Sequence, residues 1–215
     1  MTDADLRLTE RQVFRATADD GLWDFMIAGF ATMFAIAPLL SERLGDFWSS
    51  AVFIPVFAFI YIASRAIRGR IVVDRIGVVE YGALRKRRLR RFHIVLALVN
   101  GIALALGIIS WVAFERGVVE SWLFPAMLSV IVLAACSTAA YFLDVPRFFL
   151  YGILLALAPL VGEWLFRRDL ATHHGYPITF AVAAGVMAIG GLLRFHRVTS
   201  GRSATVGYPP VENDV

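Results

Sequence analysis

Charge and cysteine are scarce in this chain of 215 residues. Asp, Glu, Lys and Arg make up 18% of it, whereas soluble domains hold about 25%. Apolar residues make up 59%, and the mean hydropathy is +0.69. The single cysteine, Cys136, permits no intrachain disulfide and no cysteine-based metal cluster. These shortages argue against a soluble domain and indicate a polytopic membrane protein.

Motifs of several enzyme classes are missing as well. The sequence has no glycine-rich phosphate loop, Gly-x-Ser-x-Gly turn, His-Glu-x-x-His helix or aspartate-rich lipid-transferase motif. Lysine occurs once, at Lys86, beside 20 arginines, a bias that fits a GC-rich prokaryotic genome. We therefore expect a non-enzymatic protein without cofactor in the plasma (inner) membrane of a prokaryote.

Six apolar stretches are long enough to cross a membrane as helices. Stretches of about 18 to 23 residues, at a rise of 1.5 Å each, cover a hydrocarbon core of about 30 Å. Backbone groups in lipid must be satisfied internally, which favours helices. The sequence thus predicts an all-α bundle of six transmembrane helices, two within residues 22–64 and four within 93–197. The spans are residues 22–40, 47–64, 93–114, 121–143, 148–166 and 175–195.

Basic residues predict the orientation of these spans. Seventeen of the 21 Lys and Arg residues fall on one side, and the other four are Arg43, Arg116, Arg167 and Arg168. Loops rich in Lys and Arg stay in the cytoplasm. Both termini are therefore expected there, as an arm over residues 1–21 and a disordered tail over 198–215. The acidic N-terminal region has no apolar signal segment, so no removable secretory signal is expected.

The polar segment of residues 65–92 is expected to form a small cytoplasmic β-hairpin followed by a basic helix extension. Two β-prone runs, residues 71–73 and 78–81, flank a turn that ends at Gly77. An irregular loop is the alternative. A lone hairpin is marginal in water, so it would rest on helix ends or lipid headgroups.

A basic run follows the hairpin and holds six basic residues in seven. Each cation near an anionic leaflet contributes about 1 kcal/mol of binding. We favour a topology determinant that rests among anionic headgroups, and a docking face for an acidic protein or a specific lipid is the sharper alternative. Nucleic acid is not an expected partner, because no aromatic platform accompanies the run. The residues are Arg85, Lys86, Arg87, Arg88, Arg90 and Arg91.

Two segments carry a resemblance to a protein family. Gly21-Leu22-Trp23-Asp24 opens the first span, and residues 74–81, Asp-Arg-Ile-Gly-Val-Val-Glu-Tyr, precede the basic run. This resembles a group of small uncharacterised prokaryotic membrane proteins, in which two spans are followed by an Arg-x-Gly-Tyr-Val-like cytoplasmic segment. Val78 stands where that pattern has Tyr. The resemblance covers roughly the first 95 residues, and it implies a class of protein but no chemistry.

Few polar groups lie within the spans, and Asn100 and Glu163 are the candidates for an intramembrane polar site. Asn100 is expected to hydrogen-bond across the bundle. Glu163 lies four residues before Arg167, a spacing that favours an ion pair over a proton or cation role. Asp24, near the start of the first span, is expected to cap its helix or to pair with a basic neighbour.

The four histidines offer weaker candidates. His93 and His196 lie at cytoplasmic helix ends and could ligate a b-type haem, but we favour interfacial histidines on different faces. His173 and His174, together with Asp169, could capture a metal in an outer loop, although no further ligand is evident. We therefore expect neither haem nor metal.

Small residues in the sixth span, Ala181, Ala184, Gly185 and Ala188, predict close helix packing, because small side chains let backbones approach. For function we expect a scaffold, accessory or regulatory component of a membrane complex. A small transporter, or the substrate-binding subunit of one, is the alternative. A membrane-embedded enzyme has the least support.

Overall fold

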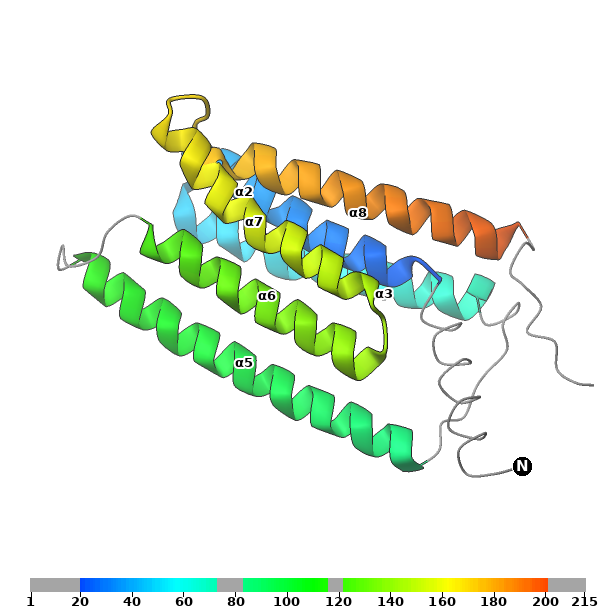
Figure 1. Ribbon diagram of the computed structural model, residues 1–215. Helices are drawn as coiled ribbons and strands as arrows, with labels where there is room; N and C mark the ends of the chain where they lie inside the picture. The colour runs from blue at the N-terminus through cyan, green and yellow to red at the C-terminus, as the bar shows by residue number, and fades with distance from the viewer. Residues whose placement is uncertain (1–19, 73–82, 116–121, 201–215) are drawn as a thin grey trace, which may run out of the picture.

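The computed structural model describes residues 20–72, 83–115 and 122–200. Six of its helices are long and apolar enough to cross a membrane, which confirms the six spans and the all-α class. Successive spans run antiparallel (Figure 1). The helices are α2 (Leu22–Ala51), α3 (Phe53–Ile67), α5 (Ala83–Glu115), α6 (Leu123–Leu143), α7 (Arg147–Arg167) and α8 (Tyr176–Thr199).

Most described basic residues lie at one end of the molecule, which we call the basic end. There α2, α5 and α7 begin, and α3, α6 and α8 finish (Figure 1). The opposite end, which we call the histidine end, comprises residues 41–47 and 163–175. The basic end holds Arg65, Arg68, Arg70, Lys86, Arg87, Arg88, Arg90, Arg91, Arg147, Arg194 and Arg197.

The first two spans join without the loop predicted over residues 41–46. Helical backbone continues past Pro38 to Leu44, and Gly45 then breaks it with φ 76° and ψ 162°. Glycine tolerates this positive φ because it has no Cβ atom. The chain reverses at this point, so the spans become Leu22–Gly45 and Phe47–Arg70.

The predicted β-hairpin is not supported, and the described residues contain no strand. Ile71 and Val72 belong instead to a π-helical turn, η1 (Arg68–Val72), that directly continues α3. Extending an existing helix adds a hydrogen bond for each residue fixed, and this outweighs the β preference of two branched side chains. Residues 73–82, the rest of the predicted hairpin, lie outside the described residues, as do 1–19 of the arm and 201–215 of the tail. Val198 and Thr199 of the predicted tail end α8.

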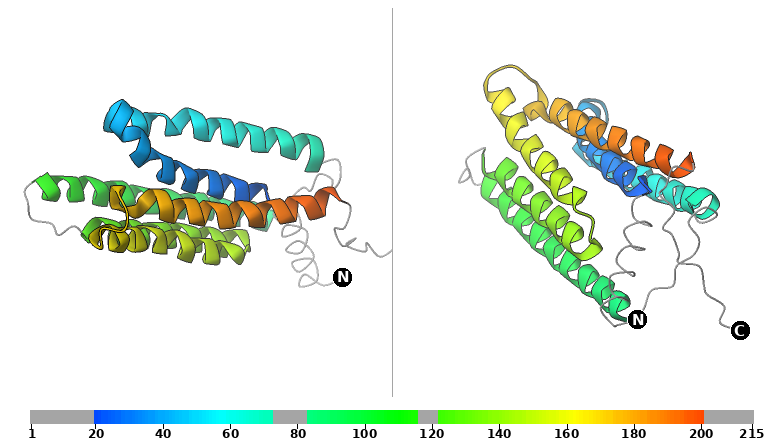
Figure 2. Two further views of the ribbon diagram at one scale, coloured as in Figure 1. Left: turned by 90° about the horizontal axis from the view of Figure 1, so that it is seen from above. Right: turned by 45° about the vertical axis from the view of Figure 1, so that its right-hand side comes forward.

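The helices form a row more than a closed ring. Their main contacts run in the order α3, α2, α8, α7, α6, α5, and Figure 2 shows the helices from two further sides. No residue is buried in the apolar stretches of the spans that contain α3 and α5, whereas half of the residues in the apolar stretch of α7 are buried. The two outer helices therefore present most of their surface to whatever surrounds the chain.

The core lies between α2, α6, α7 and α8. The buried side chains that α2 contributes to it are alanines, Ala28, Ala31 and Ala35. Phe34 stacks on Phe180 of α8 with ring centroids 5.2 Å apart. Small side chains on α2 let α8 approach closely, so dispersion contacts hold this pair of helices together.

The small-residue face predicted for α8 is only half right. Ala184 is buried and Ala188 packs against the core, but Ala181 and Gly185 are exposed. The packed face carries Phe180, Ala183, Met187 and Gly191, which recur every three or four residues along the helix. Large side chains occupy part of that face, so the small size of a residue did not predict which side of α8 is buried.

Candidate functional site

Asp24 is the centre of a buried ion-pair cluster at the basic end. Its side chain is 0% exposed. One carboxylate oxygen accepts a hydrogen bond from Arg147 Nε at 2.8 Å, and the other from Arg194 Nη1 at 3.3 Å. Arg194 also donates to the hydroxyl of Tyr151 at 3.3 Å. The cluster thus ties α2 to α7 and α8, as the sequence predicted in part when it paired Asp24 with a basic neighbour.

Asp20 is a second buried acid, which the sequence did not single out. Its Oδ1 accepts the backbone N–H of Leu22 at 3.0 Å and so caps the start of α2. Its Oδ2 lies 3.4 Å from Arg68 Nε and has no hydrogen-bond partner. Burial raises the pKa of Asp20 above its ordinary value, although the Arg68 guanidinium opposes this.

The predicted basic run opens α5, and one of its members is already paired. Arg88 donates to both oxygens of Asp144, at 2.8 and 3.1 Å, and to the carbonyl of Tyr141 at 2.6 Å. Asp144 ends α6 in the left-handed conformation, with φ 55°. A bidentate guanidinium–carboxylate pair is a strong contact. Arg88 therefore fastens α5 to α6.

The other described members of the run stay available to a partner. Lys86, Arg87, Arg90 and Arg91 are all exposed. Lys86 and Arg90 also line a hollow on α5 with His93, and its apolar part comprises Leu89, Ile94 and Ala97. A basic rim beside apolar side chains suits an acidic, partly apolar surface.

At the histidine end, Glu163, a candidate for an intramembrane polar site, contacts Arg167 and His174. Its side chain is 2% exposed. Oε1 accepts a hydrogen bond from Arg167 Nε at 3.1 Å, which confirms the expected i,i+4 pair, and Oε2 lies 2.8 Å from His174 Nδ1. The imidazole lies against Phe166, with ring centroids 4.3 Å apart.

A tight turn between α7 and α8 brings His174 to Glu163. A Cβ atom at Gly162 would lie 2.6 Å from the His174 carbonyl oxygen, so the two segments touch through their backbones. His173 and His174 both have positive φ, 52° and 54°. Histidine adopts this region more readily than most residues. No pattern in the sequence predicts the contact between Glu163 and His174, because it depends on the turn.

The histidines do not assemble as a metal or haem site would require. His173 Nε2 lies 3.1 Å from Glu42, whereas His174 contacts Glu163, and no group of three potential metal ligands exists among the described residues. His93 and His196 are exposed on α5 and α8, which are not neighbours in the order of main helix contacts.

Asn100 does not form the predicted contact across the bundle. It is exposed on α5, and its side-chain amide donates to the carbonyl of Leu96 at 2.8 Å. The prediction was wrong because it assumed that α5 lies inside the bundle. A side-chain amide can donate a hydrogen bond to the backbone carbonyl four residues earlier in the same helix, so Asn100 needs no partner on another helix.

The chemistry of these clusters is electrostatic. Asp20, Asp24 and Glu163 each have a cationic or imidazole partner, and the pairs join different helices or turns. No family model, curated protein or solved structure matches the chain.

Proposed function

We propose that the chain is a non-enzymatic accessory component of a membrane complex, whose basic end faces the cytoplasm. One contrast supports this. The described buried acids are engaged within the chain, whereas Lys86, Arg87, Arg90 and Arg91 project together from the start of α5. Positive charge of this density favours the cytoplasmic side. The proposed partner is an acidic surface: anionic lipid headgroups together with an acidic face of a neighbouring membrane protein.

A transporter has less support. The alternative needs polar groups that converge near the middle of the membrane. Asn100 satisfies its own helix, and Glu163 is held at the histidine end. The proposed origin in a prokaryotic inner membrane rests on arginine usage and on the resemblance of the first two spans.

The test compares a variant of the exposed bases on α5 with a control at the histidine end. The variant carries Lys86→Gln, Arg87→Gln, Arg90→Gln and Arg91→Gln, and it spares Arg88, which holds Asp144. The control neutralises Arg43 and Arg168, two exposed arginines at the histidine end. Each chain is extracted in mild detergent at two salt concentrations, and co-purifying proteins and lipids are identified by mass spectrometry.

The wild type and the control are expected to retain the same acidic protein and anionic lipids, more strongly at low salt. The four-residue variant is expected to lose both. A wild-type chain that purifies without a partner protein would contradict the accessory role. Equal retention and equal salt dependence in all three chains would contradict the role of the basic surface.

A further inference from the structure

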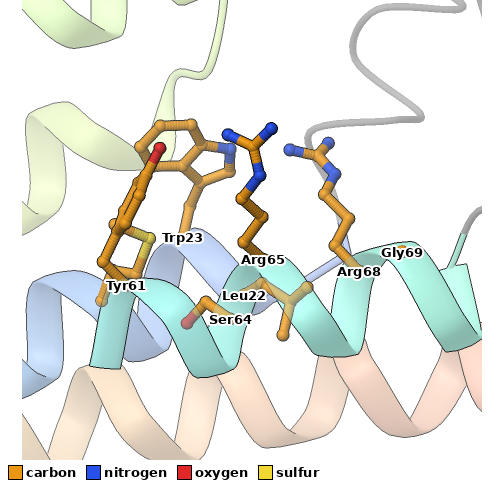
Figure 3. A pocket seen from close by; sticks show the side chains of 8 residues that line it. Leu22, Trp23, Tyr61, Ser64, Arg65, Arg68 and Gly69 are labelled. Atoms are coloured by element: carbon orange, nitrogen blue, oxygen red, sulfur yellow. The ribbon is translucent and has the colours of Figure 1, made fainter. Parts of the chain in front are cut away.

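A cavity lies between the start of α2 and the end of α3. Its apolar, polar and cationic lining residues follow one another in the same order as the acyl chain, glycerol and phosphate of a lipid. The volume of the cavity is about 420 Å³, and Arg65 and Arg68 of the basic end are among its lining residues. Met26 lines the cavity one helical turn after Trp23 on α2. Tyr61 of α3 lies beside Trp23 (Figure 3). These side chains form an apolar floor, with the indole and phenol at the depth where such rings meet headgroups.

Polar and cationic side chains follow on the next turns of α3. Ser64 and Arg65 come one turn beyond Tyr61, and Arg68 comes one turn further. Figure 3 shows both guanidinium groups on the side where Trp23 lies. Because a helix rises 1.5 Å per residue, Tyr61 and Arg68 are about 10 Å apart along the axis. That depth matches the step from acyl chain through glycerol to phosphate.

The charges at the mouth fit a single phosphodiester. Arg68 is offset by Asp20, whose Oδ2 lies 3.4 Å from its Nε. Arg65 is exposed and forms no ion pair with a described residue. Arg65 therefore supplies a positive charge that no described residue offsets, and a guanidinium binds phosphate oxygens in bidentate geometry. A zwitterionic lipid would bring an ammonium group towards the same arginines.

We infer that this cavity, which we call the α2–α3 slot, binds one anionic phospholipid with a single phosphodiester, such as phosphatidylglycerol. The phosphate lies between Arg65 and Arg68, the glycerol lies near Ser64, and one acyl chain follows Trp23 and Met26. The inference does not rest on the proposed function, because it uses none of the exposed bases of α5.

Two variants test the charge of the slot and its volume separately. Arg65→Gln removes the unpaired cation. Gly69→Leu places a side chain at the mouth, where a Cβ atom at Gly69 meets no atom within 4 Å, so the fold accommodates it. Arg197→Gln is the control, since Arg197 is an exposed base at the same end but outside the slot. Thermal unfolding in detergent verifies that all variants remain folded.

The measurement is native mass spectrometry of the full chain with dioleoyl-phosphatidylglycerol or dioleoyl-phosphatidylethanolamine at equal concentration. The first phosphatidylglycerol is expected to bind the wild type and Arg197→Gln at least about fivefold more tightly than the first phosphatidylethanolamine. Arg65→Gln is expected to abolish this preference, and Gly69→Leu is expected to weaken both lipids. The variant with four neutral residues on α5 is expected to keep the preference.

Three outcomes would overturn the inference. The first is equal binding of both lipids by the wild type. The second is an equal loss of affinity in Arg65→Gln and Arg197→Gln, which would indicate a diffuse charge effect. The third is displacement of the bound phosphatidylglycerol by free glycerol phosphate at the concentration of the lipid, which would mean that the slot takes phosphate without acyl chains.

Discussion

A carboxylate removed from water is costly unless cations and hydrogen bonds reach it. Asp24 and Asp20 are both fully buried near the start of α2, but they meet this cost differently. Asp24 has two arginines within 3.3 Å, whereas Asp20 has one helix N–H and a guanidinium at 3.4 Å. Removal of the charge should therefore affect stability differently at the two residues.

Neutralising Asp24 is expected to destabilise the fold. Asp24→Asn leaves Arg147 and Arg194 without their shared carboxylate, and breaking such a buried pair costs about 3 kcal/mol. The unfolding midpoint in detergent should fall clearly. Asp169→Asn is the matched control, because Asp169 is exposed and has a positive φ that asparagine tolerates. Equal midpoints for the two variants would show that the cluster adds no stability.

Neutralising Asp20 is expected to change how stability depends on pH. Its pKa is raised above 3.8 by burial, so the folded chain holds this proton at a pH where the unfolded chain has lost it. Stability therefore falls as pH rises from about 4 through the raised pKa. Asp20→Asn removes this titration and keeps an oxygen for the Leu22 N–H.

The measurement is the difference between the unfolding midpoints of Asp20→Asn and the wild type at several pH values from about 4 to 7. This difference should move in favour of Asp20→Asn as the pH rises, and it should level off above the folded pKa. A constant difference, or a shift in favour of the wild type, would contradict the prediction.

Among the elements, α8 allows a test with two glycines on one helix. A Cβ atom at Gly191 would lie 3.0 Å from the Cβ of Asp24 and 3.1 Å from the Gly21 carbonyl oxygen, whereas one at Gly185 would meet nothing within 4 Å. Gly191→Leu is expected to separate α8 from α2 and to cost about 3 kcal/mol. Gly185→Leu is expected to change stability by less than about 0.5 kcal/mol.

Thermal unfolding of the two variants in the same detergent measures this difference. If both glycines tolerate leucine, α8 does not pack on α2 through Gly191. If Gly185→Leu alone unfolds the chain, the exposed face of α8 is covered by another subunit.

The sequence predicted the positions of the helices better than the contacts between them. Hydropathy located all six spans, because length and composition of a span are local properties. The spacing of Glu163 and Arg167 predicted their pair for the same reason. The partners of Asp24 and Asp144 could not be assigned from the sequence. Arg147 and Arg194 reach Asp24, and Arg88 reaches Asp144, only because their helices pack side by side in the folded chain. Asn100 failed similarly, because nothing in its span shows that α5 lies at the end of the row.

For the whole molecule, the orientation can be tested with single cysteines in a Cys136→Ala background. Arg43→Cys and Thr172→Cys lie at the histidine end, and Arg90→Cys and Arg197→Cys lie at the basic end; all four positions are exposed. A membrane-impermeant maleimide added to intact cells is expected to label only the first pair, because basic segments stay inside. Labelling of Arg197→Cys with protection of Thr172→Cys would reverse the orientation.

The Asp24 cluster also sets an order of events during synthesis. Arg147 and Arg194 follow Asp24 by 123 and 170 residues. A ribosome adds about 5 to 20 residues per second, so Asp24 waits on the order of ten seconds for these partners. During that interval the nascent first span carries a carboxylate without its two arginines. Water, the translocation machinery or an insertion chaperone must stabilise that carboxylate until α7 and then α8 are made. The cluster at the start of α2 is therefore complete only when α8, the last of the described helices, has been synthesised.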